Sequence, residues 1–207
     1  MKFIAVIRQV PDGESRLRTQ GGRVDLSGTT LILDQMDEYG VEEALRLKEK
    51  HGGEAIVVGF GPERTEEAIR TALAMGMDRG IHVAFEGYAD PVTVAEALAP
   101  VIQEEAPTLV LTGGQQADWD SQALGPALAE ALGMPVIPWT TVLELEGETA
   151  RAKHDLDEGA EWVRVRLPAL FTTQQGLNEP RYPTLPGIMK AKKKEIKKVA
   201  FQGSSRV

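Results

Sequence analysis

Short apolar runs alternate with segments of helical period through the first two-thirds of this 207-residue chain, and this alternation restricts the fold more than any other feature. The apolar runs cover residues 3–7, 55–59, 81–85 and 109–111. Short, continuous apolar runs are typical of strands that are covered on both faces. Such strands, separated by helices, predict an α/β fold with a doubly wound, mostly parallel sheet of the Rossmann-like, adenine-nucleotide-binding type and helices on both faces.

The helical segments between these runs carry recognisable start and stop signals. The first helix presents Val41 and Leu45 on one face and is expected to end at Gly52, where glycine favours a left-handed cap. Another is expected to begin after Asp90, which can cap its N-terminus, with Pro91 in the first turn. Each helix therefore lies between two expected strands, as a parallel sheet requires.

From residue 142 onward the apolar period changes from helical to two. Residues 142–146, 150–152 and 162–167 alternate in this way, with a turn at Gly147. This pattern predicts antiparallel strands appended to the parallel core. We expect one α/β domain over residues 1–177, with residues 178–207 forming a partner-recognition loop and a basic C-terminal arm of that domain.

The composition excludes several classes of function. The chain contains no cysteine, which excludes disulfides and thiolate metal sites and suits the cytoplasm. Its net charge of −8 argues against a nucleic-acid partner, because phosphate neutralisation requires a cationic surface. The apolar run before Arg8 is too short for a membrane span, so we expect no direct membrane insertion.

The segment after the run 109–111 has the features of a phosphate cradle. Gly113 and Gly114 permit close backbone approach, and polar side chains follow at Gln115, Asp118, Asp120, Ser121 and Gln122. Pro126 must lie in the first turn of the next helix, so that helix cannot begin much before residue 123. The amides of about residues 121–125 would then face outward and attract a phosphate. An ordinary strand-to-helix turn explains the same residues equally well.

Residues 178–194 have the composition of a docking surface. Three prolines in seven positions, 180, 183 and 186, predict an extended, stiff loop. Within it Tyr182, Leu185, Ile188 and Met189 are apolar, and six lysines follow between residues 190 and 198. An ordinary loop before a solvated lysine-rich tail is the alternative.

The segment Asn178-Glu-Pro-Arg-Tyr-Pro-Thr-Leu-Pro-Gly-Ile-Met-Lys-Ala-Lys-Lys-Lys194 closely resembles the recognition loop of the electron transfer flavoprotein beta subunit. Residues 41–50, residues 70–80 and the pattern Asp155-x-Asp157-x-Gly159-x-Glu161 resemble further segments of that family, in the same order. The resemblance therefore covers nearly the whole chain.

This resemblance implies a non-catalytic electron carrier without a metal site. In the family, an alpha and a beta subunit form a heterodimer that carries FAD, bound mostly by alpha, and AMP, buried in beta. The flavin takes electrons from dehydrogenases such as acyl-CoA dehydrogenases of fatty acid oxidation. It passes them to a quinone-linked oxidoreductase.

The resemblance also implies roles for individual residues. The AMP pocket would be lined by Val6, Asp34, Gln35, Met36, Asp37, Phe60, Gly113, Gln115 and Asp118. The phosphate would lie on the amides of Ser121, Gln122, Ala123 and Leu124. Leu185 would enter a hydrophobic pocket of a partner dehydrogenase, together with Pro186, Ile188 and Met189. Asp155 would pair with an arginine of the mobile FAD domain of alpha.

Several positions depart from the usual family pattern. Asp34 stands where asparagine is common, Leu124 where a threonine hydroxyl often meets the phosphate, and Trp119 within what is often an acidic run. These changes weaken side-chain contacts and leave the backbone cradle possible. Many relatives also continue beyond the position of Val207 with an arm that wraps the alpha subunit, so we expect an effect on heterodimer geometry.

Two other functions fit a nucleotide-binding sheet. An ATP-using hydrolase or ligase would need a phosphate-loop cation or a metal site, and neither is visible near Gly113. The three histidines, at positions 51, 82 and 154, are scattered singly. A nucleotide-sensing module without a redox role is the other alternative.

Overall fold

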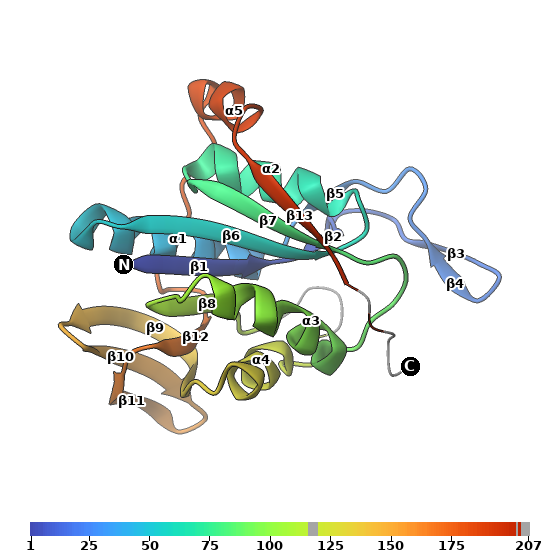
Figure 1. Ribbon diagram of the computed structural model, residues 1–207. Coiled ribbons are helices and arrows are strands. Elements are labelled where there is room, and N and C mark those ends of the chain that lie inside the picture. Colours follow the sequence, from blue (N-terminus) through green and yellow to red (C-terminus); the bar gives the residue numbers. More distant parts are fainter. Residues whose placement is uncertain (116–119, 202, 204–207) are drawn as a thin grey trace.

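The computed structural model describes residues 1–115, 120–201 and 203, with the Arg23 side chain left out. Its central element is a nine-stranded sheet in the order β11-β10-β9-β12-β8-β1-β6-β7-β13 (Figure 1). The strands that run parallel are β1 (Lys2–Ile7), β6 (Glu54–Gly61), β7 (Arg79–Ala84), β8 (Leu109–Gly113), β9 (Val136–Glu146), β12 (Ala169–Thr173) and β13 (Ile196–Ala200). The predicted doubly wound, mostly parallel sheet is confirmed.

The antiparallel extension lies at one end of this sheet. β10 (Thr149–Leu156) pairs antiparallel with β9 and with β11 (Gly159–Arg166). The period of two predicted these strands correctly. The sequence interpretation missed β12, which lies between β9 and β8 and joins the extension to the parallel core. β12 is buried along its whole length, and only the first three of its five residues are apolar, so its apolar run is a short signal of a covered strand.

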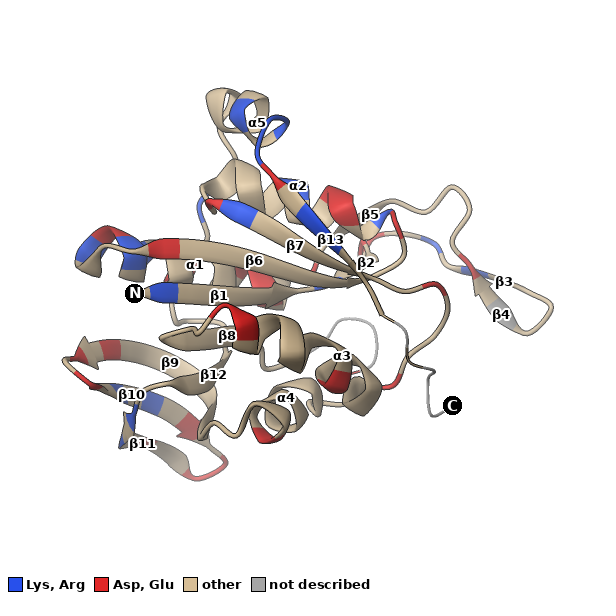
Figure 2. Ribbon diagram, in the orientation of Figure 1, with Lys and Arg blue, Asp and Glu red and all other residues tan. Residues whose placement is uncertain are grey.

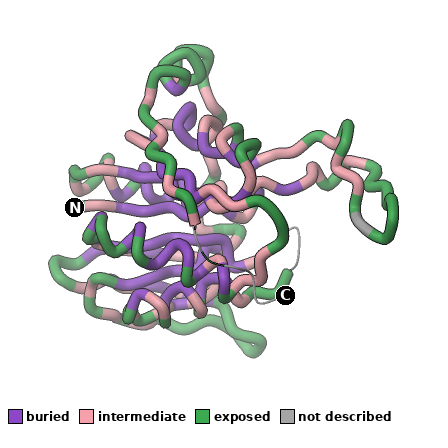
Figure 3. The backbone as a smooth tube through the Cα atoms, turned by 45° about the vertical axis from the view of Figure 1, so that its right-hand side comes forward, coloured by how far each residue is buried: buried purple, intermediate pink, exposed green. Residues whose placement is uncertain are grey.

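Two layers of helices cover the sheet and divide the core into two clusters. α1 (Gln35–His51) and α2 (Thr65–Met75) pack Val41, Leu45 and Ile69 against Phe3 and Ile7. On the other face, α3 (Pro91–Glu104) and α4 (Leu124–Leu132) pack Leu98, Ile102 and Leu128 against Ile4 and Val6. Neighbouring residues of β1 thus serve opposite faces, and the buried strands run through the middle of the molecule (Figure 3).

The helix ends agree with the sequence signals. The α3 N-terminus is capped by Asp90, whose Oδ1 accepts the amides of Val92 and Thr93. α1 ends at Gly52, with a φ of 72°, and α4 ends at Gly133, which is left-handed. As expected from Pro126, α4 begins at Leu124.

The structure corrects the prediction of an extended loop over residues 178–194. Residues Leu185–Ala191 form a short helix, α5, capped by the Thr184 hydroxyl, which accepts the amide of Gly187. Pro186 lies in the first turn of α5, where a missing N–H costs nothing. The spacing of Leu185, Ile188 and Met189 is that of one helical face, a signal that the three prolines obscured.

The lysine-rich segment after α5 is also more ordered than a solvated tail. It contains the edge strand β13, which pairs parallel with β7. Lys194 donates to the carbonyls of Leu73 (3.2 Å), in the last turn of α2, and of Met77 (2.5 Å), just beyond that helix. Lysines gather on α5, the following turn and β13 (Figure 2).

Two small antiparallel pairs complete the fold. β2 (Gln9–Pro11) pairs with β5 (Leu31–Leu33) beside the carboxyl end of β1. β3 (Arg18–Gln20) and β4 (Arg23–Asp25) form a hairpin that projects from the body (Figure 1). These short strands carried no clear period in the sequence.

A charged cluster joins four elements, β1, β6, β7 and the end of α3, at the amino edge of the sheet. Glu105, at the end of α3, accepts hydrogen bonds from Lys2 (3.0 Å) and from Arg79 (2.5 and 2.9 Å), and Arg79 also pairs with Glu54. Hydrogen bonds from Arg79, and then from Lys2, lower the pKa of Glu105 to about 2. The charged form of Glu105 therefore stabilises the folded chain.

We expect Glu105→Gln to lower the free energy of unfolding near neutral pH by on the order of 3 kcal/mol, the equivalent of this pKa shift. The contribution is complete above the unfolded pKa of 4.5 and is lost as the pH falls through about 2. Denaturant unfolding at several pH values measures it. The exposed Glu104, which pairs with Lys197 at 3.3 Å, provides the control variant Glu104→Gln, with an expected loss of about 0 to 1 kcal/mol. An equal deficit for Glu105→Gln at neutral and strongly acidic pH would contradict this assignment.

Candidate nucleotide pocket and docking helix

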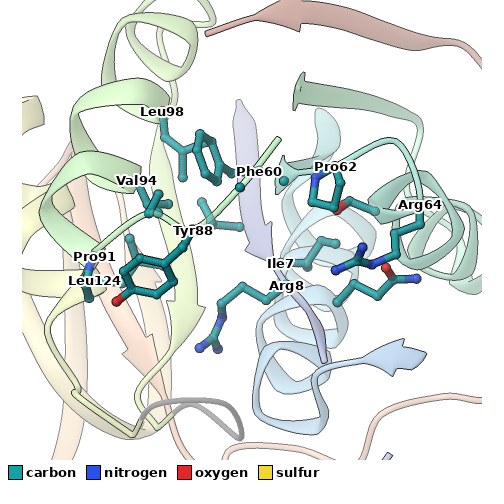
Figure 4. A pocket seen from close by; sticks show the side chains of 16 residues that line it. Ile7, Arg8, Phe60, Pro62, Arg64, Tyr88, Pro91, Val94, Leu98 and Leu124 are labelled. Atoms are coloured by element: carbon teal, nitrogen blue, oxygen red, sulfur yellow. The ribbon is translucent and has the colours of Figure 1, made fainter. Parts of the chain in front are cut away.

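A pocket of about 210 Å³ opens at the carboxyl edge of the parallel sheet. After β1 the chain adds β6 and β7 on one side of β1, and it then crosses over to form β8 on the other side. In doubly wound sheets, ligands bind next to the point where the strand order reverses in this way. Figure 4 shows Phe60, Tyr88 and Arg8 around the hollow and Arg64 on its other side. Its lining consists of Val6, Ile7, Arg8, Gln9, Phe60, Gly61, Pro62, Arg64, Thr65, Gly87, Tyr88, Ala89, Pro91, Val94, Leu98 and Leu124.

The structure divides the expected AMP-site residues between two hollows. Val6, Phe60 and Leu124 line the pocket. Asp34, Gln35, Met36 and Gln115 instead line a neighbouring hollow, together with residues 10–14, Ile32 and Asp120. Neither hollow is lined by Asp37, Gly113, Ser121, Gln122 or Ala123, and the side chain of Asp37 is fully buried.

Arg8 and Asp37 form a buried ion pair between these hollows. Asp37 Oδ2 accepts the backbone amide of Arg8 (2.9 Å) and its Nε (3.0 Å), and Asp37 Oδ1 accepts Arg8 Nη2 (2.8 Å) and the amide of Gly113 (2.9 Å). Asp34 Oδ2 lies 3.4 Å from Arg8 Nη2, and its Oδ1 caps α1 by accepting the Met36 amide. The ends of β1 and β8 are thereby fastened to the start of α1.

Electrostatics at this point oppose ionisation of the buried carboxylate. Burial, together with the negative charge of Asp34, raises the pKa of Asp37 to about 6 against the attraction of Arg8. Glu38, on the same turn, also has a raised pKa, through burial and the charges of Asp34 and Asp37. A carboxylate with this pKa changes its charge closer to neutrality than an ordinary aspartate does.

The segment from Gly113 to Leu124 leads from β8 to α4. Ser121 and Gln122 are exposed, Ala123 is half-buried, and no side chain caps the helix start at Ala123. The first amides of a helix have no acceptor within the helix, so this start can receive an anion. Asp118, another predicted contact, and Trp119 lie outside the described residues.

Phe60, which lines the pocket, belongs to a cluster of three aromatic rings. Phe60 stacks on Phe85 with ring centroids 5.4 Å apart, and Phe201 meets both rings edge to face, at 6.0 and 5.7 Å. Phe201 follows β13 directly, so the chain beyond α5 returns to pack against Phe60. An aromatic cluster of this kind suits a flat heterocycle such as a nucleobase.

The second candidate site is the outer face of α5. Leu185 is 75% exposed and Met189 58%, and Pro186 and Ile188 are exposed beside them. Large apolar side chains grouped on one exposed helix face are typical of a protein-binding surface. The four predicted docking residues therefore share one element.

Polar contacts hold this helix against α1 and α2. Before α5, Asn178 donates to the Tyr39 carbonyl and to Glu43, both at 3.0 Å, and Arg181 pairs with Glu42 (2.8 Å) and Glu49 (2.6 Å). After it, Arg70 donates to the carbonyls of Ala191 (2.7 Å) and Lys194 (2.6 Å). The apolar face is thus presented on a fixed support.

α5 packs closely against α2, and this contact requires a glycine in α5. A Cβ at Gly187 would collide with the Ala74 carbonyl, so only glycine allows α5 to approach α2 so closely.

Asp155 lies elsewhere, exposed on β10 in the antiparallel extension, towards the opposite end of the sheet from α5. The structure therefore keeps the two predicted partner contacts apart.

Sequence reasoning missed the part played by Arg8. It noted the end of the first strand and gave the arginine no role, although a charged residue directly after a buried strand lies at the ligand-binding edge. Arg64 and Tyr88, which also line the pocket, carried no such signal.

Among the described residues, no His, Asp or Glu side chains cluster as a metal site, and no helix is long and apolar enough to cross a membrane.

The fold and the pocket define a class: doubly wound α/β proteins with a ligand pocket at the carboxyl edge of the sheet. Comparison with known proteins is more specific. The model of the electron transfer flavoprotein domain matches residues 23–203. The electron transfer flavoprotein subunit beta of Bradyrhizobium diazoefficiens is 43% identical over 201 residues, covering 95% of this chain and 80% of that protein.

Relatives from distant organisms show similar agreement. The electron transfer flavoprotein subunit beta of Sus scrofa is 41% identical, over 95% of this chain and 80% of its own length. That of Bacillus subtilis is 39% identical, over 96% and 79%. The chain belongs to the electron transfer flavoprotein beta subunit family, as its resemblance to that family predicted.

The raised pKa of Asp37 leads to a direct prediction. Because the folded chain binds this proton more tightly than the unfolded chain, the contribution of Asp37 to stability falls as the pH rises from about 4 to about 6, by up to about 3 kcal/mol. Carbon NMR of the Asp37 carboxyl should give a midpoint near 6, against 3.8 for an ordinary aspartate. A midpoint for Asp37 below 4 would exclude the dominance of burial.

Proposed function

We propose that this chain is the AMP-holding, docking subunit of a heterodimeric electron transfer flavoprotein, with FAD bound mostly by its alpha subunit partner. The exposed, firmly anchored apolar face of α5 is the observation that carries the proposal. Electrons would pass from dehydrogenases, including acyl-CoA dehydrogenases of fatty acid oxidation, through the flavin to a quinone-linked oxidoreductase. The chain itself would break no bonds, and it would act in the cytoplasm.

The adenylate would occupy the pocket beside β1. The aromatic ring of Phe60 suits the base, and the start of α4 at Leu124 suits the phosphate. Val6, at the end of β1, would contact the nucleotide from the floor of the pocket. The family's amide cradle would be supplied by Ser121, Gln122, Ala123 and Leu124.

The residues of the neighbouring hollow would act differently. Asp34, Gln35, Met36 and Gln115 are separated from the pocket lining by the Arg8–Asp37 pair. They would therefore contact the nucleotide only if this edge rearranged on binding. A contribution to the surface that meets the alpha subunit is consistent with their place beside β2 and β5.

Docking would depend on shape and apolar contact more than on charge. Leu185, Pro186, Ile188 and Met189 would enter a hydrophobic pocket on a dehydrogenase, where buried aliphatic anchors contribute most of the binding energy. The lysines near α5 would speed the approach of an acidic partner. At the other end of the sheet, Asp155 would pair with an arginine of the alpha subunit.

Nucleotide content tests the adenylate part of the proposal. The chain, purified together with its flavin-bearing partner and then denatured with acid, should release AMP in an amount equal to the FAD. Chromatography with ultraviolet detection measures both compounds. Release of FAD without any adenine mononucleotide would contradict the proposal, as would turnover of ATP by the isolated chain.

Kinetics test the docking part. Because Leu185 is the most exposed apolar side chain of α5, Leu185→Ala should raise the KM of a dehydrogenase for this carrier by about tenfold, the loss typical of an interface anchor. The FAD content of the heterodimer should not change. Leu17→Ala is the matched control, since Leu17 is 53% exposed near the projecting hairpin. Equal KM values for wild type and Leu185→Ala would show that α5 is not the docking element.

A further inference from the structure

Asp37 occupies an unusual place in the adenylate-binding edge. Its side chain is fully buried, and its two oxygens accept four N–H groups, from the backbone and side chain of Arg8 and from the amide of Gly113. It therefore cannot contact a molecule in the pocket. It joins the ends of β1 and β8, the two strands between which the chain order reverses.

Gly113 shows how tightly this junction is assembled. A Cβ on Gly113 would lie 2.6 Å from Asp37 Oδ1, 3.1 Å from Arg8 Nη2 and 3.1 Å from the backbone carbon of Met36. Three chain segments thus meet at one point, and only glycine leaves room for the carboxylate. The same Arg8 Nη2 also donates to the Gln115 carbonyl at 3.4 Å, on the segment that leads to α4.

Arg8 transmits this arrangement to the pocket. Its side chain lines the pocket beside Tyr88 and Leu124, the first residue of α4, and is 14% exposed (Figure 4). The Asp37 carboxylate holds the Arg8 guanidinium through Nε and Nη2, which fixes its orientation. Fixed donors bind phosphate oxygens better than mobile ones. Because Arg8 and Leu124 line the same pocket, a phosphate at the start of α4 would share that pocket with the fixed guanidinium.

We propose that Asp37 is a positioning residue for the adenylate: it fixes Arg8 and the start of the Gly113 segment, so that AMP is held through its phosphate although Asp37 never contacts it. This inference rests on the proposed function, because it requires the adenylate to occupy this pocket. It changes the part assigned to Asp37 from lining the nucleotide site to supporting it.

An asparagine cannot replace this carboxylate. Its single side-chain oxygen can serve either Arg8 or Gly113, and its amide nitrogen would then face the N–H groups of the other. Asp37→Asn therefore preserves size while it releases one of the two strands. Asp78→Asn is the matched control, because Asp78 also accepts a backbone amide (Ala55, 2.9 Å) and a cation (Lys48, 2.6 Å), but next to the amino end of β6.

The experiment measures the affinity of nucleotide-depleted heterodimers for AMP and for adenosine by calorimetry. For Asp37→Asn, we expect AMP to bind at least about tenfold more weakly, while adenosine affinity stays within about twofold of wild type. Asp78→Asn should change neither affinity. A purely structural role of Asp37 predicts equal losses for both ligands, and that result, or unchanged AMP binding, overturns the proposal.

If Asp37→Asn cannot be purified, the variant Arg8→Lys tests the same positioning role. The lysine keeps a cation beside Asp37 but lacks the forked geometry, so AMP should again be weakened more than adenosine. Equal or absent losses overturn the proposal here too. A wild-type heterodimer that binds neither ligand would instead refute the proposed adenylate site itself, and the role of Asp37 with it.

Discussion

A buried carboxylate, which accepts hydrogen bonds from the ends of two strands, holds together the carboxyl edge of the parallel sheet. Asp37 receives the N–H groups of Arg8 and Gly113, and so binds β1, β8 and the start of α1 into one unit. Burial opposes its ionisation, as the raised pKa shows, yet four hydrogen bonds and one guanidinium favour the charged form. A buried ion pair is weak evidence for stability, and its hydrogen bonds here fix the orientation of Arg8, which lines the pocket at the end of β1.

The two proposed sites belong to one continuous packing arrangement. α5 is fastened to α1 through Arg181 and to α2 through Arg70, and the chain then continues through β13 to Phe201. Phe201 packs on Phe60, a wall of the pocket. A bound adenylate would therefore stiffen the same body that carries the docking face, which gives an unreacted nucleotide a physical role. Rigid support lowers the entropy lost when α5 meets a partner.

The sequence predicted the features that follow from local chemistry. Continuous apolar runs marked the strands at residues 3–7 and 55–59, and Asp90, Gly52 and Pro126 marked helix ends correctly. It missed α5, because prolines dominate the segment, and β13, because lysines conceal an edge strand. The division of Val6 and Asp34 between two hollows, and the burial of Asp37, depend on how distant segments meet, which no local pattern records.

An experimental structure of the heterodimer tests the central claim most directly, since it would show the pocket and α5 in the assembled protein. We expect density for AMP against Phe60, with its phosphate between the start of α4 and Arg8, and the apolar face of α5 open to solvent. A pocket filled by protein side chains, or an α5 face covered by the alpha subunit, would contradict the account.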